Sequence, residues 1–369
     1  LMAHIDGLVV NGPLVARKML IPALEEDEPD RVSAAAAALL QAPRESGGRD
    51  AVFEALREMP EQRPPLVRAL CCVADPELLT RIRGLLIDED SGLVAAAAEV
   101  LAFHFQPLGD TLGLLLASEA VDARVVALRA VATESEPGRF VRAVQAGLTD
   151  ADPRIVDAAI ETGVRLHLAA AWGRARTRAE DADGGGSMLL LALRAEASDQ
   201  AFLSAALRDR KRRLAALWAL GFLGTPKAVD DSLEWLEEAA TGPLAGEVFT
   251  AVTGVDLEEA KISLSVEEDE EALEWRAEDD LPRPNPMDVM QCWMKLRGNF
   301  AVGQRYVRGA VRSPSNLLVA LTDGQMRRRP THLLDLELHA AAKDRPRLQV
   351  RAPTSRQLAQ LAQHDRSGT

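Results

Sequence analysis

DPRIVDAA, at residues 152–159, is the stretch that decides the fold, because similar stretches begin at Asp90 and at Asp122. The starts are 32 and then 30 residues apart, a period typical of helical repeats. Each copy places an aspartate, an N-cap residue that can accept a backbone N–H, ahead of a helix. β-branched or leucine residues and an alanine-rich stripe follow. The pattern predicts stacked helices that bury small side chains along shared seams.

Weaker copies of the stretch extend the array in both directions. They lie at residues 29–35 and 209–217, with degenerate candidates at 64–70 and 188–193. The array would then contain about five to seven stacked helix pairs. The repeated stretch resembles the second helix of a HEAT repeat. The chain is 47% apolar but only 4% aromatic, so alanine, leucine and valine must build the seams. We predict an all-α, right-handed, HEAT-like α-solenoid over residues 1–257.

Charge is distributed unevenly along the chain. Residues 281–369 contain 15 Lys and Arg against 6 Asp and Glu, whereas the whole chain has a formal net charge of −13, so the first 280 residues carry −22. Such an acidic body repels phosphate backbones and attracts basic proteins, which argues against nucleic-acid binding by the array. We predict a basic helical C-terminal domain over residues 286–369, after a linker or docking segment over residues 258–285.

The acidity is greatest just before the proline cluster that starts at Pro282. Nine acids lie among the fourteen residues 267–280, and Arg276 is the only base there. This acidic block could be a solvated linker, a docking surface for a lysine- and arginine-rich protein, or an internal clamp on the basic domain. The candidate partner-binding residues are Glu267, Glu268, Asp269, Glu270, Glu271, Glu274 and Glu278.

The chain carries no recognised catalytic motif. It lacks a zinc-binding His-Glu-x-x-His helix, a Gly-x-Ser-x-Gly elbow, a P-loop and a dinucleotide fingerprint. His332 and His339 are seven residues apart, too far to share a metal. The glycine-rich residues 179–187 lack the strand, helix and lysine of a phosphate loop, so we interpret them as a mobile break between helix pairs. We predict no catalytic residue, no metal and no cofactor.

Cysteine usage and hydropathy bear on the location of the protein. Cys71 and Cys72 are adjacent and Cys292 is remote, so they form no disulfide framework and fit a reducing compartment, which predicts the cytoplasm. No run of 18 apolar residues occurs, which predicts no membrane span.

Two features of the basic domain suggest particular roles. Tyr306 is the only tyrosine, and we expect its ring to pack while its hydroxyl caps a backbone group. The arginines at 327–329 precede an apolar helix and are expected to cover the acidic edge of the array, with a phosphate-binding patch as the alternative.

Motifs in the last third of the chain resemble one family of proteobacterial HEAT-repeat proteins. They are FTAVTGVDL (249–257), DLP (280–282), Trp293, GQRY (303–306), GQMRRR (324–329), the helix at 333–341 and RAPTSRQ (351–357), joined by HIDGL at 4–8. Members of that family are often encoded beside type VI secretion genes. The resemblance implies service to a secreted toxin and supplies no catalytic residue. The acidic block is longer than in that family, which makes it a candidate for partner-specific recognition.

Two functions therefore lead. The first is an immunity protein that binds and neutralises a cognate type VI secretion antibacterial toxin, a basic protein and preferably a nuclease such as a DNase, in a tight complex. The alternative is an adaptor that loads an effector for secretion. An enzyme on a HEAT scaffold would need a motif or a cationic surface that the sequence does not offer. We expect no direct binding to nucleic acid or membrane.

Overall fold

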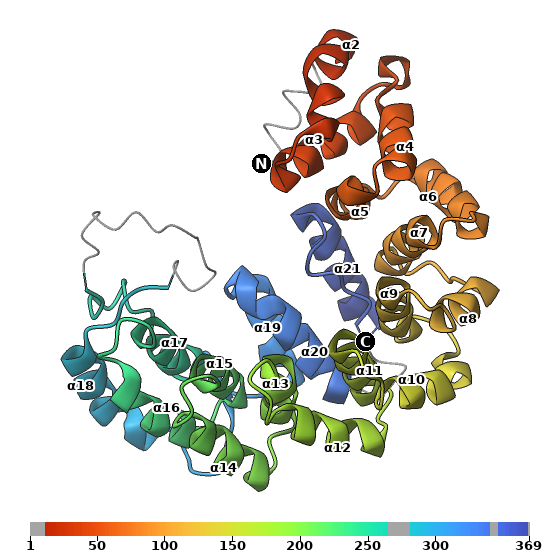
Figure 1. The fold of residues 1–369 in the computed structure, drawn as a ribbon. Coiled ribbons are helices and arrows are strands. Elements are labelled where there is room, and N and C mark those ends of the chain that lie inside the picture. Colours follow the sequence, from red (N-terminus) through yellow and green to blue (C-terminus); the bar gives the residue numbers. More distant parts are fainter. Residues whose placement is uncertain (1–11, 265–280, 340–345, 368–369) are drawn as a thin grey trace. The chain divides into compact units, whose positions relative to one another are not determined.

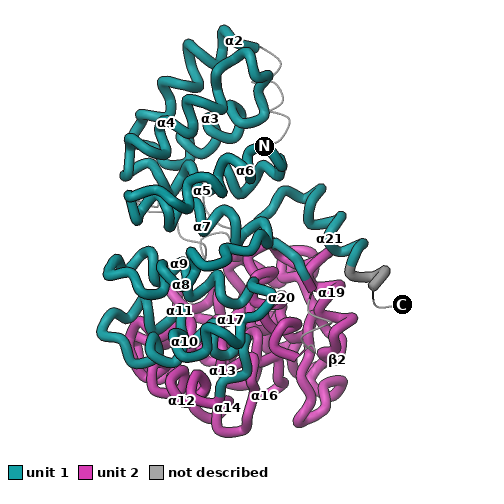
Figure 2. The backbone as a smooth tube through the Cα atoms, turned by 90° about the vertical axis from the view of Figure 1, so that its right-hand side faces the viewer, with its two compact units in different colours: residues 1–168, 347–369 teal, residues 169–346 magenta. Residues whose placement is uncertain are grey.

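The computed structural model describes residues 12–264, 281–339 and 346–367, and these residues are almost wholly helical (Figure 1). The predicted all-α helical repeat solenoid is confirmed. The chain forms two compact units, one of residues 1–168 with 347–369 and one of residues 169–346 (Figure 2). The repeat helices are therefore shared between the units, and residues 286–339 pack within the second unit.

In the first unit, helices alternate between two layers (Figure 1). Helices α3, α5, α7, α9 and α11 pack side by side in chain order, and α4, α6, α8 and α10 lie against them. The elements of this unit are α2 (Gly12–Val15), η1 (Ala16–Leu20), η2 (Pro22–Glu25), α3 (Pro29–Gln41), η3 (Arg44–Ser46), α4 (Gly48–Glu58), η4 (Pro60–Gln62), α5 (Arg63–Cys72), α6 (Pro76–Arg83), η5 (Gly84–Ile87), α7 (Ser91–Phe103), α8 (Asp110–Leu116), α9 (Val121–Val131), η6 (Pro137–Phe140), α10 (Val141–Gly147), α11 (Pro153–Arg165) and α21 (Thr354–Ser367).

The aspartates of the repeated stretch act in two ways. Asp90 and Asp152 are N-caps, and their carboxylates accept the backbone N–H groups of Gly92 and Arg154, each at 2.8 Å. The prediction of an N-cap at Asp122 is wrong, because α9 begins one residue earlier, at Val121. In the first turn of α9, the Asp122 carboxylate instead accepts a hydrogen bond from the Arg154 guanidinium at 2.9 Å, which ties neighbouring repeats together.

Three of the seams between neighbouring inner helices also contain a buried or half-buried polar tie. Ser33 Oγ donates to the carbonyl of Pro65 at 2.7 Å, and Thr162 Oγ1 donates to the carbonyl of Leu128 at 2.8 Å. His104 Nε2 contacts the Leu70 carbonyl at 3.1 Å. The partners are 32 to 34 residues apart, so the repeat period appears again in these contacts.

Within the first unit, the C-terminal helix α21 contacts the end of α7 through a neutral histidine, His104. Arg356 Nη1 lies 2.7 Å from His104 Nδ1. A guanidinium only donates, so Nδ1 accepts and Nε2 carries the proton that is donated to the Leu70 carbonyl. Burial, together with the Arg356 charge, lowers the pKa of His104 and keeps it in this neutral form.

Within the second unit, taken by itself, the helices also form two layers. Helices α13, α15 and α17 pack side by side, and α12, α14 and α16 lie against them. Its elements are α12 (Ala169–Arg178), α13 (Gly185–Arg194), α14 (Ala197–Ala206), α15 (Arg213–Leu223), α16 (Pro226–Ser232), η7 (Leu233–Trp235), α17 (Gly242–Thr253), α18 (Pro286–Leu296), η8 (Arg297–Asn299), β1 (Tyr306–Val307), β2 (Ala310–Val311), α19 (Pro314–Asp323), η9 (Met326–Arg328) and α20 (Arg329–His339).

The glycine-rich break is shorter than predicted, since α13 begins at Gly185 and includes the last three residues of the stretch. Close packing explains these glycines. A Cβ at Gly184 would lie 2.0 Å from the carbonyl oxygen of Arg178, and one at Gly185 would lie 3.2 Å from the Cβ of Ala215. The stretch therefore brings α13 close to α12 and α15.

A short antiparallel hairpin, β1 with β2, covers the C-terminal ends of two inner helices. Tyr306 N–H donates to the carbonyl of Gly224 at 2.7 Å, just beyond α15. Arg308 N–H donates to the carbonyl of Ala251, in the last turn of α17, at 2.8 Å. The hairpin thereby satisfies carbonyl groups that the helices leave unpaired at their ends.

Arg305, one residue before the hairpin, pairs four more helix-end carbonyls. Its guanidinium donates to Ala192 and Leu193 of α13 at 3.1 Å each, and to Phe222 and Leu223 of α15 at 3.1 and 2.9 Å. Burial lowers the pKa of Arg305 to about 10, so the group remains charged at neutral pH.

The expected role of Tyr306 is confirmed as well, because its hydroxyl accepts the N–H of Ala301 at 2.8 Å.

Arg305→Ala should lower the free energy of unfolding by about 3 kcal/mol, because it leaves four buried or half-buried carbonyls without their charged donor. Urea unfolding followed by circular dichroism measures the change. Arg210→Ala is the control, since Arg210 is exposed in the same unit and should alter stability by less than about 0.5 kcal/mol. Equal effects of the two substitutions would contradict the stabilising role of the Arg305 hydrogen bonds.

Candidate functional site

The seven predicted partner-binding residues, from Glu267 to Glu278, lie outside the described residues, so their role stays a prediction. The two ends of their segment are described. Leu264 N–H donates to the carbonyl of Arg283 at 2.7 Å, and Asn285 N–H donates to that of Ile262 at 2.8 Å. The described residues on either side of the acidic block are therefore hydrogen-bonded to each other, immediately before α18.

Among the arginines at 327–329, Arg328 is a packing residue. Arg328 is only 6% exposed, and its guanidinium donates to Glu247 Oε1 at 3.0 Å and to the Gly221 carbonyl at 2.9 Å. It also lies 3.9 Å from the centre of the Phe222 ring. Arg328 thus pairs with an acid of α17, in line with the expected covering role, and cannot reach a phosphate from this position.

A second ionic cluster joins the hairpin to α20. The Arg312 guanidinium pairs with the buried carboxylate of Asp335, with Nε 2.6 Å from Oδ2. His339 lies beside them, its Nδ1 2.8 Å from the Asp335 carbonyl oxygen. The adjoining cavity has a volume of about 70 Å³ and is lined by Arg312, Pro314, Leu317, Leu336 and His339. That space is about the size of a few water molecules.

The two histidines considered for a metal play different parts. His332 is buried with its ring edge against Phe222, 5.3 Å between centres, whereas His339 is partly exposed. Within the described ranges, no three His, Cys, Asp or Glu side chains are grouped so that they could hold a metal ion. In those ranges too, no helix has the length and apolar composition of a membrane span.

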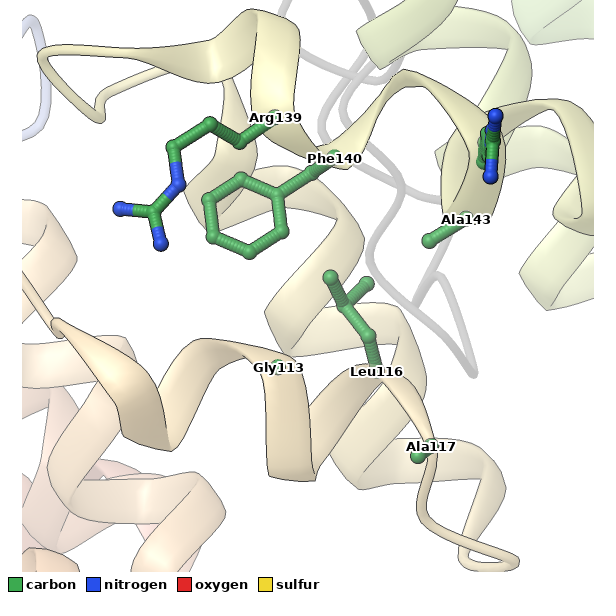
Figure 3. A pocket seen from close by; sticks show the side chains of 7 residues that line it. Gly113, Leu116, Ala117, Arg139, Phe140 and Ala143 are labelled. Atoms are coloured by element: carbon green, nitrogen blue, oxygen red, sulfur yellow. The ribbon is translucent and has the colours of Figure 1, made fainter.

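The first unit contains a hollow between α8 and the segment η6–α10 (Figure 3). Its volume is about 280 Å³, and its walls are mainly apolar, with Leu116 opposite the Phe140 ring. Two exposed arginines, Arg139 and Arg142, complete the lining. These lining residues include no acid, histidine or thiol.

The surface of the first unit is acidic. Residues 12–168 and 347–369 of this unit contain 26 Asp and Glu against 20 Lys and Arg. Many of the arginines are held in ion pairs within the unit, such as Arg68 with Asp30 at 2.6 Å and Arg81 with Asp50 at 2.6 Å. Exposed carboxylates with no hydrogen bond or ion pair to another described residue include Glu25, Asp27, Glu45, Glu54, Glu58, Glu61, Glu89, Asp110, Glu119 and Glu136. These carboxylates are available to a cationic partner.

Comparison with known proteins shows no family. No family model matches the chain, and no curated protein matches it. Among solved structures, an engineered protein from the Northeast Structural Genomics Consortium is 12% identical, with 92% of each chain covered and a TM-score of 0.33. Similarity at this level carries no argument.

Removing the carboxylate of Glu247 should be costly, because it leaves the buried charge of Arg328 uncompensated. We expect Glu247→Gln to lower the free energy of unfolding by about 3 to 5 kcal/mol, and the double variant Arg328→Met/Glu247→Leu to recover much of it. The matched control is Glu234→Gln, which breaks the exposed pair of Arg208 with Glu234 and should cost less than about 1 kcal/mol. Urea unfolding of the four proteins tests this, and a double variant as unstable as Glu247→Gln would contradict it.

Stability should fall in mild acid because His332 must stay neutral in the fold. Burial, and then the charge of Arg328, lower the pKa of His332 to about 3. In the unfolded chain, His332 takes up a proton near pH 6.5. The stability that neutral His332 allows is therefore complete above pH 6.5, and it is lost as the pH falls toward 3, by about 1.4 kcal/mol per pH unit. Urea unfolding between pH 7.5 and 5 should show a shallower dependence for His332→Leu than for the unsubstituted chain. The same slope in both would refute the assignment.

Proposed function

We propose that the chain is an immunity protein that binds and neutralises a cognate type VI secretion antibacterial toxin in the cytoplasm. The resemblance of its C-terminal motifs to a family encoded beside type VI secretion genes suggested this role. A helical repeat solenoid suits it, because stacked helix pairs offer long surfaces for protein recognition. Fold alone does not assign a function, so the proposal depends on the distribution of charge.

One observation carries the proposal: arginines of the C-terminal part are buried in contacts, whereas many carboxylates of the first unit are exposed. Arg305 and Arg328, from the basic part of the sequence, are turned inward and hold helices together. The exposed surface of the first unit keeps an excess of carboxylates, and the acidic block adds nine acids in fourteen residues. A surface of this kind favours a cationic protein as partner.

A nuclease is the preferred toxin, because its substrate channel must attract a phosphate backbone and is therefore basic. Carboxylates that face such a channel would accelerate association and oppose the entry of nucleic acid. Neutralisation would then require a tight complex of one toxin with one copy of this chain. No chemistry by this chain is needed.

Co-expression tests the proposal directly. The toxin encoded beside this chain should arrest growth when it is expressed alone, and growth should return when this chain is expressed with it. Unchanged arrest in the presence of soluble chain would sink the immunity proposal. Loss of toxin secretion on deletion of the chain, without any protection of cells, would instead identify the loading adaptor.

Charge reversal tests whether the acidic block is the recognition element. Replacing Glu267, Glu268, Asp269, Glu270 and Glu271 by lysine should weaken toxin binding at least about tenfold, and more so at low salt, where screening is weak. Calorimetric titration at two salt concentrations gives the affinities. The control is Glu54→Lys/Glu58→Lys/Glu61→Lys, which reverses unpaired exposed carboxylates of the first unit. Equal weakening by both sets would show general attraction and no specific site.

A further inference from the structure

Helix α18 exposes three methionine side chains along one face. Met287, Met290 and Met294 are 62, 40 and 77% exposed. Their spacing of three and then four residues makes them neighbours on the helix surface. The other exposed positions of this helix are Gln291 and Lys295, so thioethers dominate its outer side.

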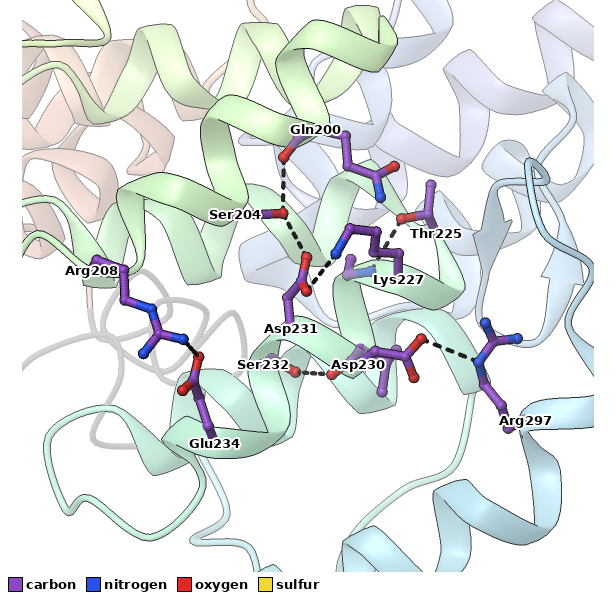
Figure 4. A network of polar contacts seen from close by, with 12 residues as sticks. Gln200, Ser204, Arg208, Thr225, Lys227, Asp230, Asp231, Ser232, Glu234 and Arg297 are labelled. Atoms are coloured by element: carbon purple, nitrogen blue, oxygen red, sulfur yellow. Dashed lines mark hydrogen bonds and ion pairs between the residues drawn. The ribbon is translucent and has the colours of Figure 1, made fainter.

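The opposite face of α18 holds this orientation firmly. Trp293 is buried, its Nε1 donates to Asp230 Oδ1 at 2.7 Å, and its ring packs edge-on against Phe249. Arg297, just beyond the helix, reaches the other oxygen of Asp230 at 3.3 Å (Figure 4). Rotation that buried the methionines would break these contacts, so the thioethers remain at the surface.

The chemistry of a thioether points to one class of ligand. The sulfur is soft, neutral and has no proton to lose, and such donors select Cu(I) over harder cations such as Mg²⁺ or Ca²⁺. Methionine also has three rotatable bonds, which let side chains one turn apart on a helix bring their sulfurs together. Cys292, on the same helix, is half-buried and packs against the core, so it is not one of the ligands.

We propose that Met287, Met290 and Met294 form a surface site for Cu(I), in which the central Met290 and either neighbour one turn away supply two thioether sulfurs. The site does not depend on the proposed immunity function, and it can be tested on the isolated chain. Leucine offers a sharp substitution here, because it keeps the apolar side chain and removes only the sulfur. A face that serves only to dock an apolar partner would tolerate leucine, whereas a thioether site would not.

The test uses Ag⁺, a redox-stable analogue of Cu(I), added as silver nitrate in chloride-free buffer to protein with ¹³C-labelled methionine methyl groups. The background variant is Cys72→Ser, because Cys72 is an exposed thiol that would compete for soft metals. The methyl signals of Met287, Met290 and Met294 should move together and saturate near one equivalent of Ag⁺. Met19 and Met326 are internal controls, since they are 60 and 69% exposed and have no other methionine within two helical turns.

Met290→Leu removes the central donor and should weaken Ag⁺ binding by about tenfold or more, because Met287 and Met294 are two turns apart and too far from each other to share the ion. The triple leucine variant should no longer withdraw Cu(I) from its bicinchoninate complex under anaerobic conditions, while its circular dichroism stays unchanged. Equal shifts at Met19 and Met326, or Cu(I) uptake by the triple variant equal to that of its parent, would overturn the proposal.

Discussion

The second unit depends on the pairing of carbonyl groups at the ends of its inner helices. Each α-helix leaves its last carbonyls without intrahelical partners, and here those ends are covered by protein and not by bulk water. Arg305 supplies donors to four of them, and the backbone of the hairpin supplies more. The C-terminal segment therefore packs onto the repeats through donors that the helix ends lack.

These inward contacts also change how the positive charge of the C-terminal segment is interpreted. A count along the sequence shows a basic segment after an acidic one, which suggests two surfaces of opposite sign. In the folded chain, Arg305, Arg312 and Arg328 bond inward to carbonyls or to carboxylates such as Asp335 and Glu247. Arg305 thus removes one positive charge from the surface, whereas the pairs Arg312 with Asp335 and Arg328 with Glu247 each remove one charge of either sign. An acidic exterior is the property on which the proposed recognition of a basic toxin rests.

Local patterns allowed much of the fold to be predicted, because a helical repeat produces a regular spacing of similar residues along the sequence. The intervals between the repeated stretches placed α7, α9 and α11. Asp122 was misassigned as a cap because α9 begins one residue earlier and draws that side chain toward Arg154. The candidate site was less predictable. The acidic block lies outside the described residues, and the spacing of the methionines on α18 became informative only once Trp293 showed which face is buried.

By itself, the sequence determined the all-α class, the repeat period, the small side chains of the seams and the surplus of acidic groups, because these depend on residue type and near neighbours. Only the tertiary structure decided which charges remain available. Arg305 lies more than eighty residues from every carbonyl it pairs, and Arg356 lies 252 residues from His104. Contacts over such separations are set by how helices stack, and no local spacing records them. The division of arginines between the interior and the surface is therefore a property of the packed helices.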